Sequence, residues 1–188
     1  MKSKSNLIVP DECKELLHKQ VTKSKCPKVE ERLTNLTKKQ YDAIRPYFPQ
    51  KIDRVLDLGG GLGRFSAYMA QEFPEAVYIV ADYDEVVDDV RWNADYRQYK
   101  GRLCNKLALT DTFLRANGVK NYSIVDLGKL EQSTKLPPVD LLVSLFAVGY
   151  HYPIDFPRYT AKVMIFQTRN NFELIQSEPK SKFLIKYA

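Results

Sequence analysis

The sequence predicts a doubly wound α/β fold with a mostly parallel sheet, and two observations lead to this prediction. Short apolar runs typical of buried parallel strands alternate along the chain with segments whose apolar residues are spaced like one helix face. Four of the eight glycines fall within five positions, between the first such strand and the helix after it. Strands that alternate with helices imply right-handed crossovers and parallel neighbours.

Composition is that of a globular protein of one-domain size. The chain has 188 residues, of which 44% are hydrophobic and 28% charged, so it is too apolar for a disordered chain. It has no apolar stretch near the ~20 residues that span a bilayer, and no apolar run follows its basic start, so we expect neither a membrane span nor a secretory signal. Three scattered cysteines do not form a disulfide framework and fit a reducing compartment, so the predicted location is cytoplasmic.

The first forty residues read as helical and basic. Asp11 follows a proline and is a predicted N-cap, and residues 24–27 look like a break. A second helix is predicted from Thr34 to Arg45, where the next proline ends it. The apolar stripe of the first helix consists of Cys13, Leu16, Leu17 and Val21.

The remainder of the chain supplies the sheet and its crossover helices. Between the strands, helix faces are predicted around residues 65–73, over 85–94 and over 103–114, where Asn117-Gly118 gives a stop. The tail runs 172–175 and 183–187 look like a hairpin that would add an antiparallel edge to a sheet of seven-stranded type. The predicted parallel strands are 54–58, 76–81, 122–125, 139–146 and 162–168.

Charge divides the chain into two parts. Residues 1–40 hold ten Lys/Arg against five Asp/Glu, whereas residues 41–188 hold 19 against 18. We therefore predict a basic helical N-terminal extension, 1–40, that acts as a lid or contacts a partner, and a nearly neutral core, 41–188.

The strongest motif is Val-Leu-Asp-Leu-Gly-Gly-Gly-Leu-Gly-Arg over residues 55–64. Glycines let the backbone pass close under a ligand, and the helix that follows presents free N–H groups to negative charge. A dinucleotide fingerprint requires a sixth-position glycine, but Arg64 and Ser66 stand at the two possible places. No Gly-Lys-Ser/Thr follows, so a P-loop is excluded.

The pattern acid-x-Gly-x-Gly-x-Gly resembles motif I of class I S-adenosylmethionine-dependent methyltransferases. The resemblance implies S-adenosyl-L-methionine as cofactor, with Gly59, Gly61 and Gly63 against its methionine part. It also implies that Asp57, in the strand end, helps to hold the loop and the cofactor's amino group. A plain strand–turn–helix corner is the alternative.

Two later strand ends carry acids in the positions that this family uses. Asp82 closes the second strand, where an acid can accept both ribose hydroxyls of a nucleoside, and Asp84 is a competitor two residues on. Asp126 closes the third strand, where the family often binds the adenine amino group. A helix or turn cap is an equal alternative for Asp126.

The segment after the fourth strand, Ser-Leu-Phe-Ala-Val-Gly-Tyr-His-Tyr-Pro over 144–153, is similar to the sugar O-methyltransferase branch of this family. The resemblance implies that Ser144 belongs to the cofactor site. His151 has the position of a general base, and Asp155 could orient it; a packed structural histidine is the alternative. No metal site is expected, because Cys13, His18 and Cys26 lack metal-ligand spacing.

The predicted function is therefore methyl transfer from S-adenosylmethionine to an oxygen of a small acceptor, such as a sugar. Two rivals stay open. The basic residues 1–40 could serve an RNA methyltransferase, because phosphate binding needs such charge. The chain is also short between the fifth strand and the tail, where the family normally inserts a helix, so a catalytically degenerate cofactor-binding module is the second rival.

Overall fold

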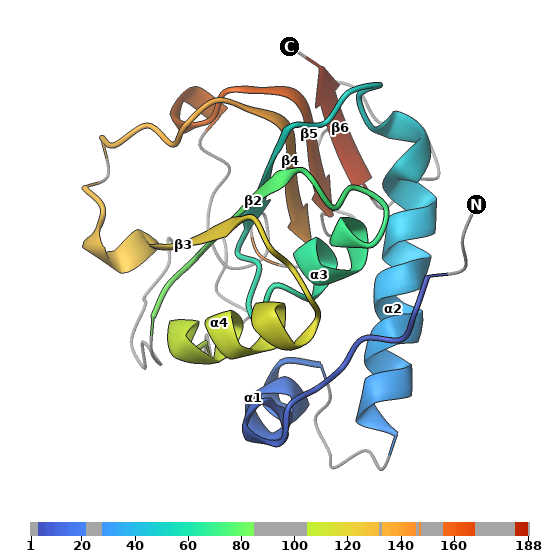
Figure 1. Ribbon diagram of the computed structural model, residues 1–188. Coiled ribbons are helices and arrows are strands. Elements are labelled where there is room, and N and C mark those ends of the chain that lie inside the picture. Colours follow the sequence, from blue (N-terminus) through green and yellow to red (C-terminus); the bar gives the residue numbers. More distant parts are fainter. Residues whose placement is uncertain are drawn as a thin grey trace.

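A computed structural model of the chain describes residues 4–21, 28–84, 105–131, 133–145, 147, 156–167 and 183–187. Within these residues six strands form one sheet, and four α-helices and three short 3₁₀ helices accompany them (Figure 1). The helices are α1 Asp11–Val21, α2 Val29–Ile44, η1 Arg45–Tyr47, α3 Arg64–Ala70, α4 Leu107–Ala116, η3 Leu127–Lys129 and η4 Phe156–Arg158. The strands are β1 Arg54–Leu58, β2 Val77–Asp82, β3 Tyr122–Asp126, β4 Val139–Leu145, β5 Ala161–Gln167 and β6 Phe183–Tyr187.

The sheet has the strand order β3-β2-β1-β4-β5-β6. Neighbours from β3 to β5 are parallel, and β6 runs antiparallel to β5 along its full length. From β1 the chain first builds outward through β2 and β3, and then returns to the other side of β1 with β4. This reversal makes the β1–β4 boundary a topological switch point, and ligands of open α/β sheets bind at the carboxyl ends of the strands there.

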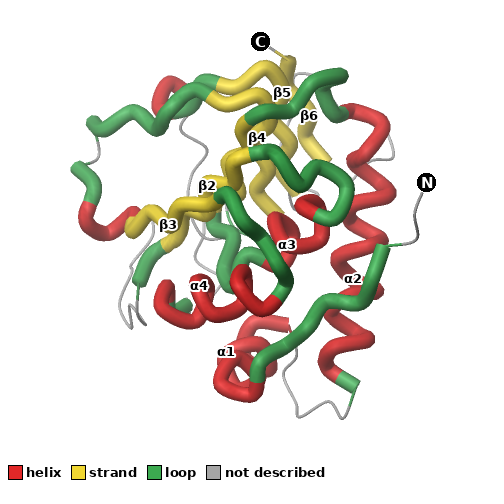
Figure 2. The backbone as a smooth tube through the Cα atoms, in the orientation of Figure 1, coloured by secondary structure: helices red, strands yellow, loops and turns green. Residues whose placement is uncertain are grey.

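All four α-helices lie on one side of the sheet, with α1 packed on α2 and α4 (Figure 2). They share a hydrophobic cluster with alternate residues of the central strands, among them Val55, Val80 and Val143. The other face carries a second cluster around Leu56, Ile79 and Leu142. The alternation follows from the two-residue period of a strand. Every second side chain of each strand points toward the helices, and the others point to the opposite face.

The N-terminal strap, residues 4–9, passes over α2 and beside the C-terminal ends of α3 and α4 before α1 begins (Figure 1). Leu7 and Val9 are buried in the same cluster as α1 and α2, so this part of the chain shares the core of the sheet. The side-chain amide of Gln71 exchanges two hydrogen bonds with the backbone of Ser5. The amide of Asn117 does the same with the backbone of Ile8 (2.9 and 2.8 Å).

Most elements agree with the sequence prediction. The mostly parallel α/β sheet is confirmed, as are strand β1 and the stop after α4, where Gly118 has φ 70° and Val119 N–H donates to Leu114. Strand β6 is antiparallel, as expected. The predicted break at 24–27, the helix at 85–94 and the first half of the tail hairpin lie outside the described residues.

Three helix starts differ from the prediction. Helix α4 begins at Leu107, later than the predicted 103, since the described residues 105–106 are not helical. Helix α1 includes Asp11, because the first backbone bond of the helix runs from Cys13 N–H to Pro10, and the Asp11 carboxylate pairs with Lys14 at 2.6 Å. The predicted N-cap at Asp11 is therefore wrong by one position. Helix α2 begins at Val29, five residues before the predicted start at Thr34.

Candidate functional site

The glycine loop, residues 59–63, joins the carboxyl end of β1 to α3 at the switch point. Gly59, Gly61 and Gly63 have φ values of 68°, 58° and 75°, which only glycine adopts readily. Gly60 lies so close to Asp57 that a Cβ on it would stand 2.9 Å from the carboxylate carbon. At each of these four positions the backbone geometry favours glycine over other residues. An ordinary turn between a strand and a helix would not need four glycines.

Asp57 lies beneath this loop and is buried, with 2% of its surface exposed. Its carboxylate accepts hydrogen bonds from the hydroxyl (2.8 Å) and the backbone N–H (3.3 Å) of Ser66, in the first turn of α3. The N-cap residue of α3, Gly63, has no side chain, so Asp57 supplies the cap from the neighbouring strand. Burial raises the pKa of Asp57, and the bonds from Ser66 and the charge of Arg64 oppose that rise.

Asp82 holds the middle of the glycine loop from the end of β2. Its Oδ2 accepts the Gly61 N–H at 2.7 Å and its Oδ1 accepts the Tyr83 N–H at 2.8 Å. Asp82 is only 7% exposed, and these bonds to backbone donors fix the orientation of its carboxylate. Asp82 and Gly61, both singled out from the sequence, are therefore in direct contact.

Asp84, the competitor of Asp82, has a different place. Its Oδ1 accepts the N–H of Leu107, the first residue of α4, at 2.9 Å, so it caps that helix. Asp126 stands opposite Asp82 in the register of β2 and β3. It accepts the N–H groups of Gly128 (2.9 Å) and Asp84 (3.4 Å) and pairs with Lys129 at 3.2 Å.

The turn-cap interpretation of Asp126 therefore describes a contact that is present. Burial would raise the pKa of Asp126, but the hydrogen bonds from Gly128, Lys129 and Asp84 outweigh burial and lower it. The carboxylate is thus held ionised at the end of the strand, with acceptor capacity beside that of Asp82.

Ser144 and His151 are the two remaining residues of the predicted site. Ser144 is in β4, which lies beside β1 in the sheet. Ser144 is fully buried in β4, and its hydroxyl donates to the carbonyl of Leu58 at 2.8 Å, which ties β4 to the last residue of β1. His151 and its predicted partner Asp155 lie outside the described residues.

Two contacts at the loop were not predicted from the sequence. The Thr110 hydroxyl, in α4, donates to the carbonyl of Gly61 at 2.8 Å, and the Arg64 guanidinium donates to the Thr37 hydroxyl, in α2, at 2.8 Å. The sequence offered a signal for the first: Thr110 is a polar residue on an otherwise apolar helix face with Leu114. It offered none for the second.

The carboxylates of Asp57, Asp82 and Asp126 and the glycine turn therefore lie at the carboxyl ends of β1, β2 and β3. Carboxylates only accept hydrogen bonds when ionised, so this edge is suited to a ligand that presents hydroxyl and amino donors. Within the described residues, no three His, Cys, Asp or Glu side chains are grouped to hold a metal ion, and no helix is long and apolar enough to cross a membrane.

The chain has a Rossmann-like α/β fold. No protein-family model and no curated protein matches it. Solved structures do match. A candidate O-methyltransferase of Nostoc punctiforme is 13% identical over 71% of this chain and 36% of its own, with a TM-score of 0.44.

Coclaurine N-methyltransferase, solved with S-adenosylhomocysteine (SAH), is 11% identical over 87% of this chain and 46% of its own, with a TM-score of 0.48. The 16S rRNA methylase ArmA is 13% identical over 92% and 84%, with a TM-score of 0.40. The chain thus spans less than half of the first two proteins. At these identities the acceptors named for those proteins are theirs alone.

Proposed function

We propose that this chain is an S-adenosylmethionine-dependent methyltransferase that methylates an oxygen of a small acceptor, such as a sugar. The observation that carries the proposal is the bond from the Gly61 N–H, in the loop after β1, to the Asp82 carboxylate at the carboxyl end of β2. It joins the motif I glycines to the strand-end acid that the family uses for the ribose.

The residues at this edge fit a nucleoside cofactor by their hydrogen-bonding chemistry. The carboxylate of Asp82 lies at the end of β2 beside Gly61, and an ionised carboxylate only accepts hydrogen bonds, so it would accept the ribose hydroxyls. Asp126, its neighbour in register, would accept the adenine amino group. Gly59, Gly61 and Gly63 would lie against the methionine part, with Asp57 supporting the loop from below and Ser144 tying β4 to it.

The cofactor supplies an electrophilic methyl group on a sulfonium centre. The chain's own contribution would be to align the acceptor oxygen and to take its hydroxyl proton, for which we propose His151 as general base. Replacement of His151 by Asn should then lower kcat while leaving the affinity for SAH unchanged. Unchanged turnover would remove His151 from the mechanism.

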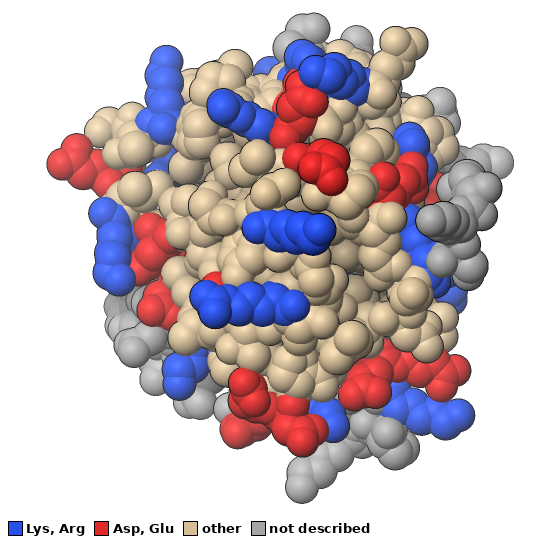
Figure 3. All heavy atoms as spheres, viewed as in Figure 1, with Lys and Arg blue, Asp and Glu red and all other residues tan. Residues whose placement is uncertain are grey.

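The basic extension, residues 1–40, is proposed to support or cover this edge rather than to bind nucleic acid. Within the described residues, Lys4, Lys14, Lys28 and Lys38 each pair with a carboxylate. Figure 3 shows positive and negative side chains interspersed over the face it displays. Retention on RNA that weakens steeply with added salt would instead favour the nucleic-acid alternative.

A thermal-shift experiment tests the proposed function. S-adenosylmethionine or SAH should raise the melting temperature, because a ligand that binds only the folded state stabilises it. Gly61→Arg should abolish this rise, because the new side chain would need a positive φ and would fill the loop. Gly118→Arg is the matched control, since that glycine also has a positive φ but nothing lies within 4 Å of its Cβ position.

The absence of any shift in the unaltered protein would contradict cofactor binding. A shift without transfer of labelled methyl to any acceptor in a cell extract would favour the degenerate cofactor-binding module over the enzyme.

A further inference from the structure

We propose that Thr110 is a positioning residue of the cofactor site, with its hydroxyl fixing the glycine loop that the cofactor would contact. The inference rests on the proposed function. Thr110 is in α4, separated from Gly61 by 49 positions in the sequence, and it is fully buried.

The first step of the argument is the geometry of the Gly61 backbone. The Gly61 N–H donates to Asp82 at 2.7 Å, and the Gly61 carbonyl accepts the Thr110 hydroxyl at 2.8 Å. The two peptide groups that flank this residue are therefore each fixed by one side chain, from β2 and from α4. Because a peptide is planar and trans, a carbonyl held toward α4 turns the N–H of Leu62 away from α4.

The second step is that the loop has freedom that something must restrict. Gly61 has φ 58°, and glycine reaches many alternative conformations at little cost. A loop of this composition would sample several orientations of its N–H groups unless its peptides were anchored. Ordering on binding lowers affinity, so an anchor that orders the loop beforehand should raise it.

The third step is the docking of α4 itself on the loop. One turn before Thr110, the N–H of Leu107 is capped by Asp84, and one turn after it, Leu114 lies 2.9 Å from the position of a Cβ on Gly63. Thr110 thus lies in the middle of the α4 face that packs against the loop, and its hydroxyl makes a polar contact with Gly61 there. A valine would preserve the shape of the side chain and remove only the hydrogen bond.

The N-terminal part of the chain holds α4 in this position from the outside. The Cys13 thiol, in α1, donates to the carbonyl of Leu109 at 3.6 Å, and Asn117, just after α4, binds the backbone of Ile8 in the strap. These contacts fix both ends of the helix that carries Thr110.

Calorimetric titration with SAH tests the proposal. Thr110→Val should weaken binding about tenfold, equal to the loss of one buried hydrogen bond, while Thr110→Ser should bind like the unaltered protein. The matched control is Thr112→Val, on the same helix, because the bond of the Thr112 hydroxyl within the described part of the chain is to the carbonyl of Ala108, one turn earlier. That variant should leave the affinity unchanged.

The melting temperature without ligand separates positioning from stability. If Thr110 only stabilised the fold, Thr110→Val would lower the melting temperature and the folded protein would bind SAH with unchanged affinity, which would overturn the proposal. If the valine variant does not fold, the Ser and Cys variants replace it. Cysteine is a weaker donor, so it should bind SAH less tightly than serine, and equal affinities would overturn the proposal.

Failure of the proposed function gives a different result. An unaltered protein that binds neither S-adenosylmethionine nor SAH contradicts the proposed function and the role of Thr110 together. Normal binding by the unaltered protein and by Thr110→Val contradicts the role of Thr110 alone.

Discussion

Two buried aspartates lie at opposite ends of the parallel strands, Asp82 at the carboxyl edge of the sheet and Asp140 near the amino edge. Their surroundings are similar, but they have different roles. Asp82, at the carboxyl edge, is 7% exposed, and Asp140, near the amino edge, is 9% exposed. Asp82 accepts the N–H groups of Gly61 and Tyr83. Asp140 accepts those of Asp53 and Arg54, at 2.8 and 2.9 Å.

The difference lies in what each carboxylate fixes. Asp140 binds the start of β1 and pairs with Lys162 of β5 at 2.6 Å, so it ties three parallel strands together. Burial raises its pKa, but Lys162 and the two backbone donors lower it by more. Asp82 instead orients a glycine that has no conformational preference of its own. Two aspartates with similar burial, each bonded to two backbone N–H groups, therefore serve stability at one edge and the shape of a loop at the other.

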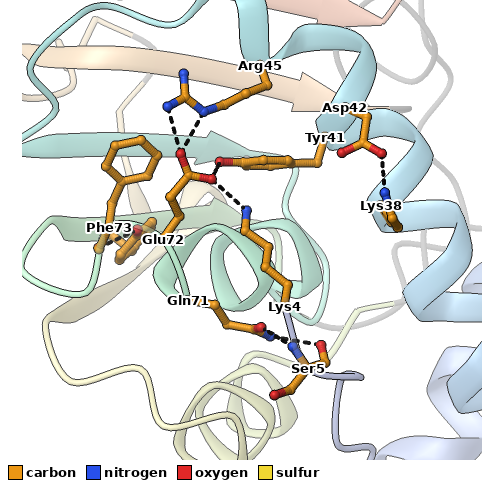
Figure 4. Close-up of polar contacts among 10 residues, drawn as sticks. Lys4, Ser5, Lys38, Tyr41, Asp42, Arg45, Gln71, Glu72 and Phe73 are labelled. Atoms are coloured by element: carbon orange, nitrogen blue, oxygen red, sulfur yellow. Dashed lines mark hydrogen bonds and ion pairs between the residues drawn. The ribbon is translucent and has the colours of Figure 1, made fainter. Parts of the chain in front are cut away.

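The amino edge carries a second charged group, at the end of α3. Glu72 accepts hydrogen bonds from Arg45 and from the Tyr41 hydroxyl (2.6 Å), and pairs with Lys4 of the strap at 3.2 Å (Figure 4). Lys4 also lies 3.2 Å from the ring centroid of Tyr41. Burial lowers the pKa of Lys4, although Glu72 beside it acts in the opposite direction.

The largest expected effect on stability comes from the glycine loop. Gly63→Ala should lower the free energy of unfolding by about 3 kcal/mol, since the new Cβ requires a positive φ and meets Leu114. Gly118→Ala should cost about 1 kcal/mol, because it has only the first of these two problems. Denaturant unfolding measures both. Equal losses would show that the loop is not packed against α4 as described.

Protonation of Glu72 at low pH should lower the free energy of unfolding of the protein. The surrounding donors outweigh burial and lower its pKa from 4.5 to about 2, so its stabilising contribution is complete above pH 4.5 and is lost as the pH falls toward 2. The difference in unfolding free energy between the unaltered protein and Glu72→Gln should therefore shrink by about 2 kcal/mol over this window.

Urea unfolding at several pH values gives that difference. Asp42→Asn is the control, because Asp42 pairs with Lys38 on the exposed surface, where an ion pair contributes little (Figure 4). A pH-independent difference for Glu72→Gln would contradict the network.

Asp140→Asn should lower the free energy of unfolding by about 1–2 kcal/mol, because the strand contacts lose a charge-assisted acceptor and the partner of Lys162. Its affinity for SAH should not change. Weaker SAH binding by Asp140→Asn would contradict the different roles given to the two aspartates.

The strap should give the smallest effect. Asn117→Ala removes both side-chain bonds to Ile8 and should cost about 1 kcal/mol, with faster hydrogen exchange at the Ile8 amide. Asn121→Ala is the control, since its amide makes one long bond of 3.5 Å to Glu75. An unchanged exchange rate at the Ile8 amide would show that the Asn117 side chain does not hold the strap in place.

The sequence was sufficient to predict a mostly parallel α/β sheet and the place of the glycine loop, but not the order of the strands. Buried parallel strands are nearly continuous apolar runs, which is why β1 could be placed to the residue, and strand-end position favoured Asp82 over Asp84, whose carboxylate caps α4. The strap could not be predicted, because side chains from three separate helices hold an extended segment that has no periodicity of its own.

Long-range polar contacts were likewise beyond the sequence. Thr110 meets Gly61 across 49 positions, and only the folded sheet shows which carbonyl a helix hydroxyl reaches. The hydrogen bond from Ser66 to Asp57 was beyond the sequence for the same reason. The glycine motif indicated that Asp57 is important, but the bond depends on how α3 packs on β1.

Titration of the Asp82→Asn and Asp140→Asn variants with SAH tests the central claim most directly. An asparagine keeps the size of the side chain and loses one acceptor, so Asp82→Asn should weaken binding by about tenfold or more, and Asp140→Asn should bind like the unaltered protein. Equal affinity for all three proteins would contradict the claim that Asp82 and the glycine loop form the cofactor site.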